Sequence, residues 1–179
     1  MNYPLDILML PIQLIVAWFT VYYTVIAVFG IWHRKDRDLS APKNKFALMI
    51  PAHNEEMVLG DLLENLKILK YPKELYDIYV IADNCTDSTA EVAHRHGAYV
   101  LERCNKELGG KGYAMDWAFP KIFETGRHYD AFCVFGADNL VHLDFLAVMN
   151  TRLMKGQKVL QGYLSAKNPV DTWVSGTFA

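Results

Sequence analysis

The pattern of the chain is set by two segments, FALMIPAHNEE (46–56) and DIYVIADNCTDST (77–89). Each starts as a short run of apolar residues and turns polar abruptly, as a buried strand does where it leaves a sheet. Between them, over residues 55–70, leucines recur at helical spacing. The two segments therefore predict a strand, a covering helix and a second strand, and each strand ends in a polar loop.

The same alternation continues along the rest of the soluble part. It predicts further strands at 98–101, 130–135 and 158–164, and further helices at 88–97, 114–126 and 143–155. The first of these helices opens with Ser88-Thr89-Ala90-Glu91, which has the spacing of a capping box. We therefore predict an α/β fold with a mainly parallel sheet and helices on both faces. In open sheets of this kind ligands bind at the carboxyl ends of the strands, so function is expected in the loops that follow them.

The excess hydrophobicity of the chain is concentrated near its start. Leu5 to Trp32 reads LDILMLPIQLIVAWFTVYYTVIAVFGIW, and a helix of that length, about 42 Å, can cross a hydrocarbon core of about 30 Å. A buried helix of a soluble protein is the alternative, but such helices are usually shorter. Basic residues from His33 to Arg37 follow the apolar segment, so the positive-inside rule puts the rest of the chain in the cytoplasm. We predict one N-terminal transmembrane anchor at 1–32, a juxtamembrane linker at 33–45, and a domain at 46–179 that is incomplete at its C-terminus.

Charge and cysteine content exclude several functional classes. The formal net charge is −2, whereas a nucleic-acid backbone is bound through many basic contacts, so we expect no nucleic-acid partner. Cys85, Cys104 and Cys133 make an odd count without CxxC spacing. We expect reduced thiols, with neither a disulfide framework nor a zinc cluster.

The loops after the first two predicted strands carry groups that suit a nucleoside. His53 and Glu55 bring an imidazole and a carboxylate to the start of a helix, where they can hydrogen-bond a base and a ribose. Asp83 leaves the second strand and can accept from the imide N–H of uracil. Simple helix capping by Asn54 and Asp87 is the alternative interpretation.

The next two loops carry groups that suit a diphosphate. Lys111 lies among glycines just before a helix, so its ammonium and the free N–H groups of the helix start favour a phosphate; a flexible surface loop is the alternative. Asp138 follows the fourth strand and can hold Mg²⁺ or Mn²⁺ against phosphates, although an aspartate there is often only a turn residue. No G-x-G-x-x-G is present, which counts against a dinucleotide-binding dehydrogenase.

Four motifs in this order resemble a known family. They are IPAHNEE, DNCTDST, GGKGYAMDWA and FGADNLVHLDFL. Together they resemble family 2 of the inverting glycosyltransferases, which have the GT-A fold and include membrane-bound enzymes related to cellulose and hyaluronan synthases. The resemblance runs from about Phe46 to Gly162, nearly all of the soluble part.

The resemblance implies a UDP-sugar donor, Mg²⁺ or Mn²⁺ as cofactor, and a set of donor-binding residues. These are Ala52, His53 and Glu55 at the nucleoside, Asp83 at uracil, Lys111 near the diphosphate, and Asp138 with Asn139 in the metal motif. The chain departs from the family where Gly136 replaces the first aspartate of Asp-x-Asp, and we recognise no acceptor segment with its catalytic base. A donor-binding half of a glycosyltransferase is therefore expected, acting on a polysaccharide, lipid or other acceptor. A non-catalytic nucleotide-sugar-binding or interaction module is the alternative.

Overall fold

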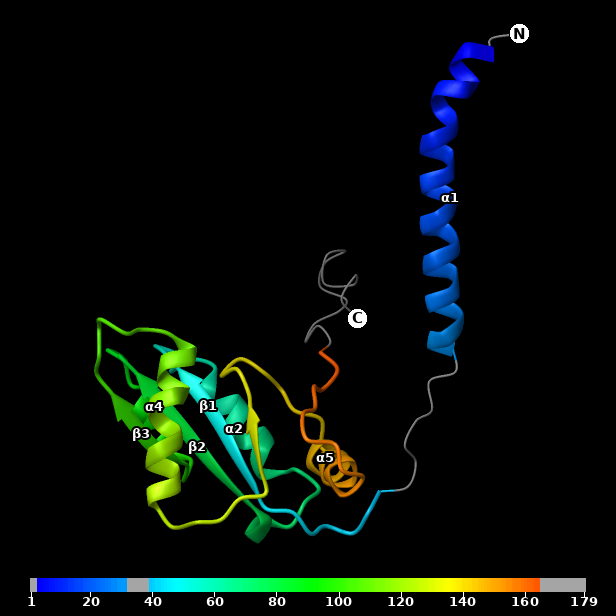
Figure 1. The fold of residues 1–179 in the computed structure, drawn as a ribbon. Helices are drawn as coiled ribbons and strands as arrows, with labels where there is room; N and C mark the ends of the chain where they lie inside the picture. The colour runs from blue at the N-terminus through cyan, green and yellow to red at the C-terminus, as the bar shows by residue number, and fades with distance from the viewer. Residues whose placement is uncertain (1–2, 32–38, 165–179) are drawn as a thin grey trace. The chain divides into compact units, whose positions relative to one another are not determined.

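The computed structural model describes residues 3–31 and 39–164, and it divides into two compact units between Asp38 and Leu39. The first unit is a single helix, α1 (Tyr3–Ile31) (Figure 1). Within it, Met9–Phe29 has a mean hydropathy of 1.9 and none of it is buried. Among the described residues, α1 is the one helix that is long and apolar enough to cross a membrane, as predicted.

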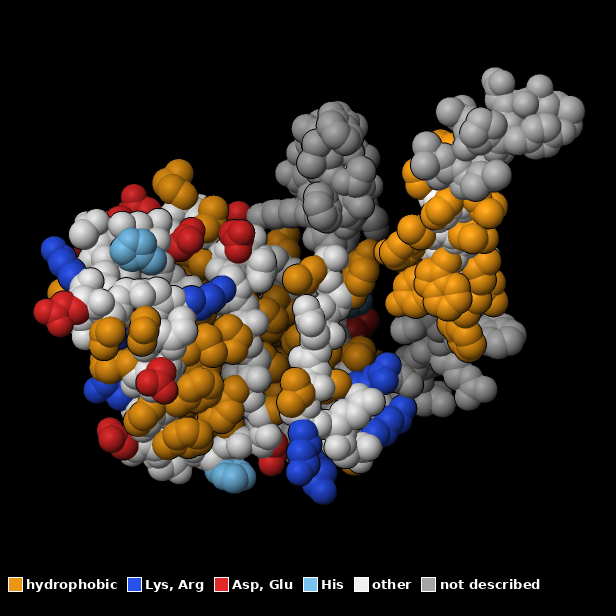
Figure 2. Space-filling view, turned by 45° about the horizontal axis from the view of Figure 1, so that its top comes forward, with side chains coloured by type: hydrophobic (Ala, Val, Ile, Leu, Met, Phe, Trp, Pro, Cys, Tyr) orange, Lys and Arg blue, Asp and Glu red, His pale blue; other side chains and the backbone are white. Residues whose placement is uncertain are grey.

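The two threonine hydroxyls of α1 are hydrogen-bonded within the helix. The hydroxyl of Thr20 donates to the carbonyl of Val16 at 2.8 Å, and that of Thr24 donates to the carbonyl of Thr20 at 2.7 Å. Figure 2 shows a helix coated with hydrophobic side chains. A surface of this kind suits lipid, because lipid offers no hydrogen bonds to exposed polar groups. The basic flank at 33–37, from which the orientation was predicted, lies outside the described residues.

The second unit is built on a four-stranded parallel sheet. Its strands are β1 (Phe46–Ala52), β2 (Tyr76–Asp83), β3 (Tyr99–Arg103) and β4 (Ala131–Val134), in the order β3-β2-β1-β4. All three neighbouring pairs are parallel, which confirms the predicted sheet. Because the strands are parallel, the loops that follow them meet at one edge, and all the predicted site residues lie in or beside those loops.

Helices cover both faces of the sheet, as Figure 1 shows. They are α2 (Leu59–Lys67), α3 (Thr89–Arg95) and α5 (Phe145–Met154) on one face, and α4 (Lys111–Glu124) on the other. Alternate residues of β1 serve the two cores: Leu48 and Ile50 pack beneath α2, and Met49 packs beneath α4. Burying such a side chain stabilises the fold by about 1.5–3 kcal/mol. A short 3₁₀ turn (Lys73–Leu75) leads into β2.

Two sequence predictions about these elements are wrong. The fifth strand predicted at 158–164 is absent, since those residues form no regular structure and Val159 is 93% exposed. An apolar run forms a strand only where a neighbouring strand provides backbone hydrogen-bond partners. Among the described residues β4 pairs with β1 alone, so residues 158–164 do not add a strand beside it. The first predicted helix also begins four residues late, because the backbone from Glu55 to Val58 forms a turn.

The capping box predicted at Ser88 is also wrong. The Ser88 side chain makes no capping bond. Instead, Oδ1 of Asp87 accepts from the N–H of Thr89 at 3.0 Å, and Oε2 of Glu56 accepts from the N–H of Ser88 at 2.9 Å. The start of α3 is therefore capped by the loop after β1 as well as by its own sequence, which ties two of the candidate loops together.

A buried asparagine ties the segment before β1 to α5. Asn150 is fully buried, and its Oδ1 accepts from the N–H groups of Lys43 and Asn44, both at 3.2 Å. Its Nδ2 donates to the carbonyl of Ala41 at 3.0 Å. The hydroxyl of Thr151 accepts from the N–H of Ser40 at 2.9 Å. Residues 40–44, in the described end of the predicted linker, are thus hydrogen-bonded to the domain. The boundaries predicted for the anchor, the linker and the domain stay predictions.

Candidate functional site

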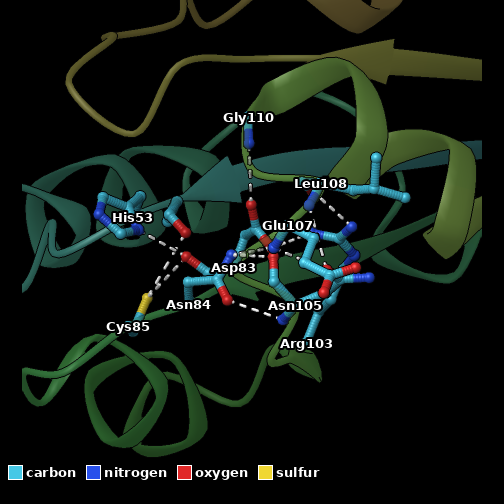
Figure 3. A network of polar contacts seen from close by, with 10 residues as sticks. His53, Asp83, Asn84, Cys85, Arg103, Asn105, Glu107, Leu108 and Gly110 are labelled. Atoms are coloured by element: carbon cyan, nitrogen blue, oxygen red, sulfur yellow. Dashed lines mark hydrogen bonds and ion pairs between the residues drawn. The ribbon is translucent and has the colours of Figure 1, made fainter.

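The loops after β1 and β2 are bonded directly to each other. Nδ1 of His53 donates to the carbonyl of Asp83 at 2.6 Å (Figure 3). Asn54 has a positive φ of 56°, and its Oδ1 accepts from the N–H of Thr86 at 2.8 Å. Asn54 therefore bridges two loops and does not cap α2, whose N-terminus has no side-chain cap. The result is a rigid rim at the carboxyl ends of the two strands.

Glu55 and Ala52 lie on the same rim. The N–H of Glu55 donates to the hydroxyl of Thr89 at 2.8 Å, and its carbonyl accepts from the N–H of Leu59 at 3.0 Å. Ala52 ends β1 and is buried, and its carbonyl faces the Cys85 thiol at 3.5 Å. The backbone of both residues is thus fixed beside His53.

A buried ion pair closes the other side of Asp83. Nη1 of Arg103 lies 2.5 Å from Oδ1 of Asp83, and only 5% and 7% of the two side chains are exposed. Nη2 of Arg103 donates to the carbonyl of Leu108 at 2.6 Å, and the N–H of Gly110 reaches Oδ2 of Asp83 at 3.4 Å. The two charged residues are paired across β2 and β3. Breaking such a buried pair is costly, so its geometry is firmly held.

Asn84 continues this arrangement beyond the last ladder pair. It has a positive φ of 53° and its N–H donates to the carbonyl of Arg103 at 2.7 Å. Its side chain then acts as a peptide group would: Oδ1 accepts from the N–H of Asn105 at 2.7 Å, and Nδ2 donates to the carbonyl of Asn105 at 3.0 Å. Figure 3 shows this bridge beside Asp83.

Sequence reasoning missed Arg103, Asn84 and Asn105. The third strand was predicted to end at Leu101, which left Arg103 in a polar loop, whereas the structure extends the strand to Arg103. The sequence did offer one indication of Arg103: a charged residue two positions after the apolar run that ends at Leu101, at the same edge of the sheet as Asp83.

Lys111 is the first residue of α4, at the end of the loop that follows β3. Gly110, its N-cap, has φ 113°, a conformation that favours glycine. The Lys111 side chain is exposed, and the N–H groups of the first turn have no acceptor within the helix. Beneath the loop lies a cavity of about 450 Å³ lined by residues 102–105 and by Leu108, Tyr113, Asp116 and Trp117. The loop thus presents a cation and helix N–H groups close to Gly110, which itself contacts Asp83.

The loop after β4 holds the predicted metal residue. Oδ1 of Asn139 accepts from the N–H of Gly136 at 2.8 Å, and Nδ2 of Asn139 lies 3.4 Å from Oδ1 of Asp138. The Asp138 carboxylate is exposed. The described residues contain no cluster of three metal-ligating side chains. Asp138 can therefore serve as one ligand of Mg²⁺ or Mn²⁺ only if a substrate supplies further oxygens, as phosphates do for such ions.

Comparison with known proteins decides the family. Residues 42–178 match the family described as "Glycosyltransferase like family 2". The chain belongs to this family. Solved structures of glycosyltransferases resemble the fold of this chain. The mannosyltransferase PcManGT of Pyrobaculum calidifontis, solved with GDP-Man and Mn²⁺, matches 92% of this chain and 48% of its own with a TM-score of 0.64 at 19% identity. TarS of S. aureus, solved with UDP-GlcNAc, matches 69% of this chain and 41% of its own with a TM-score of 0.53 at 17% identity. These likenesses confirm the expected GT-A fold.

Curated family 2 relatives are longer than this chain. The beta-monoglucosyldiacylglycerol synthase of Nostoc sp. is 34% identical over 103 residues, which are 54% of this chain and 22% of the relative. The probable glycosyltransferase YdaM of Bacillus subtilis is 27% identical over 143 residues, 72% of this chain and 33% of the relative. The chain therefore spans about a fifth to a third of the length of these two proteins.

Proposed function

We propose that this family 2 chain binds the UDP moiety of a UDP-sugar and contributes donor binding to a glycosyl transfer with inversion. The observation that carries the proposal is the buried Asp83–Arg103 pair at the carboxyl ends of β2 and β3, beside the N–H of Gly110. Support comes from the solved relatives, since TarS holds UDP-GlcNAc and PcManGT holds GDP-Man with Mn²⁺.

The free capacity of the Asp83 carboxylate favours uracil over guanine. Oδ1 already accepts from Arg103 and from Nδ2 of Asn84, whereas Oδ2 accepts one long bond from Gly110. One available acceptor suits the single imide N–H of uracil. Guanine presents two adjacent donors, N1–H and the 2-amino group, and they need both oxygens of one carboxylate. The contacts described for Arg103 use two of its five donors, which leaves donors for a uracil carbonyl.

The remaining predicted residues have complementary roles in this proposal. Ala52, His53 and Glu55 lie against the nucleoside, while Lys111 and the start of α4 face the diphosphate. Asp138, with Asn139 shaping its loop, would hold Mg²⁺ or Mn²⁺ together with phosphate oxygens. The bound ion would neutralise the charge that develops on the leaving diphosphate.

The transfer itself follows from the chemistry of inversion. The oxygen of an acceptor hydroxyl attacks the anomeric carbon from the face opposite the diphosphate, and a base takes the hydroxyl proton. As the new C–O bond forms, the bond to the diphosphate oxygen breaks and its electron pair leaves with UDP. The proposal assigns that base to no described residue.

Nucleotide selectivity tests the proposal. We expect calorimetric titration of the full chain in detergent to give saturable binding of UDP about tenfold tighter than GDP, since the wrong base leaves a buried polar group unpaired. ADP and NAD should bind more weakly still. Equal or tighter binding of NAD or GDP would show that Asp83 does not read uracil.

For the membrane, we propose that α1 spans the bilayer once with the domain in the cytoplasm. Cys104 is the exposed one of the three free cysteines. Cys85 is only partly exposed and its thiol lies 3.5 Å from the carbonyl of Ala52, and burial raises the pKa of the Cys133 thiol to about 12. A membrane-impermeant maleimide should therefore label inside-out vesicles but not right-side-out vesicles, and Cys104→Ser should remove most of the label. The reverse pattern would place the domain on the outer side.

A further inference from the structure

The loop from Cys104 to Gly110 is pinned without contributing to either hydrophobic core. None of its residues belongs to the two core clusters, and Leu108 is 46% exposed. Nevertheless the loop is held at several points. Oδ1 of Asn105 accepts from the N–H groups of Glu107 and Leu108, both at 3.1 Å, which folds the loop into a tight turn. The bonds that hold this turn are therefore not explained by core packing.

The first contacts that hold this loop come from Asn84, which follows Asp83, the proposed uracil contact. The two bonds between the Asn84 side chain and the Asn105 backbone continue the β2–β3 ladder by one step after the strands have ended. Asn84 also donates to Asp83 at 3.1 Å. The same few residues thus fix Asp83 and the start of the loop that ends at Lys111.

We propose that Asn84 and Asn105 are positioning residues that set the distance between the base-reading carboxylate of Asp83 and the phosphate-facing turn at Gly109–Lys111. The inference rests on the proposed function and deepens it, because it assigns the alignment of base and diphosphate to two residues that touch neither. Arg103 holds the far end of the turn, because its Nη2 donates to the carbonyl of Leu108 at 2.6 Å.

Preorganisation is the physical reason for such an arrangement. UDP is gripped at two separated points, and a mobile turn would have to be ordered each time the diphosphate binds. That ordering opposes binding of the diphosphate but leaves the contacts to uracil intact. A turn held in place beforehand removes this opposition.

Two substitutions release the turn in different ways. Asn105→Ala deletes the acceptor for Glu107 and Leu108 but keeps the backbone groups that Asn84 binds. Asn84→Gly deletes the bridge but tolerates the positive φ. Glu107→Gln is the matched control, since it lies in the same loop and keeps the backbone.

Calorimetry with UDP and with uridine on the full chain in detergent separates alignment from general damage. Both variants should bind UDP about tenfold more weakly. Asn105→Ala, which leaves the Asn84–Asp83 bond in place, should change uridine affinity by less than about twofold, and Glu107→Gln should match the wild type for both ligands. Amide hydrogen exchange at Leu108 should become faster in both variants.

The other outcomes overturn the inference and separate it from the proposed function. Equal losses of UDP and uridine affinity in Asn105→Ala would mean that this asparagine only stabilises the fold. Unchanged UDP binding in both variants would mean that the turn needs no fixing. Failure of the wild type to bind UDP would remove the proposed function together with this inference.

Discussion

Replacement of Asp83 by alanine is expected to weaken UDP binding by roughly 100-fold and to lower the free energy of unfolding by about 3–5 kcal/mol. The binding loss follows from removing the carboxylate that is proposed to accept from the uracil imide. The stability loss follows because Arg103, with 5% of its side chain exposed, would keep its charge without its carboxylate partner. Calorimetry and urea unfolding measure the two effects independently.

A double variant separates the two effects. Asp83→Leu with Arg103→Met removes both buried charges and keeps apolar volume, so most of the stability should return. UDP binding should not return, since no uracil acceptor is restored. Glu64→Ala, which breaks the exposed Lys67–Glu64 pair, serves as a control that should leave both properties nearly unchanged. Recovery of UDP binding in the double variant would contradict the role given to Asp83.

Much of the domain could be predicted from sequence because its strands are buried on both faces. Residues such as those of β1 must be apolar throughout when helices cover both sides, and that continuous run identifies the strand and its polar end. The loops of the candidate site follow directly, since parallel strands bring their carboxyl ends to one edge. The predicted residues His53 and Asp83 are thus brought within hydrogen-bonding contact.

What sequence could not predict depends on contacts between distant residues. Asn150 meets Lys43 and Asn44 across more than a hundred positions, and nothing in a local pattern distinguishes this buried asparagine from a surface one. Asn84 and Asn105 are typical loop residues until β2 and β3 place them opposite each other. The apolar run at 158–164 reads as a strand, but the described residues supply it with no partner strand.

A second large effect is expected at the loop after β4. Mn²⁺ should tighten UDP binding about tenfold, and Asp138→Ala should abolish this increase while leaving metal-free binding nearly unchanged. The reason is that, in the proposed site, Asp138 supplies the carboxylate ligand and the donor phosphates supply the other oxygens. A metal effect that survives Asp138→Ala would exclude this residue from the site.

Gly136 offers a matched pair of substitutions at the same place. A Cβ at position 136 would lie 2.7 Å from Oδ1 of Asp138, so any side chain there obliges the exposed Asp138 carboxylate to rotate. Gly136→Asp adds an oxygen ligand at that cost and should strengthen the Mn²⁺ effect. Gly136→Ala imposes the same displacement without a ligand and should not. Equal behaviour of the two variants would mean that a second carboxylate has no part in metal binding here.

In the proposed function, the carboxyl edge of this sheet binds UDP together with a divalent ion. The most direct test of this binding is calorimetric titration of UDP into the full chain in detergent, with and without Mn²⁺. We expect one saturable UDP site per chain, with an affinity that Mn²⁺ raises in the wild type. No saturable UDP binding under either condition would contradict it.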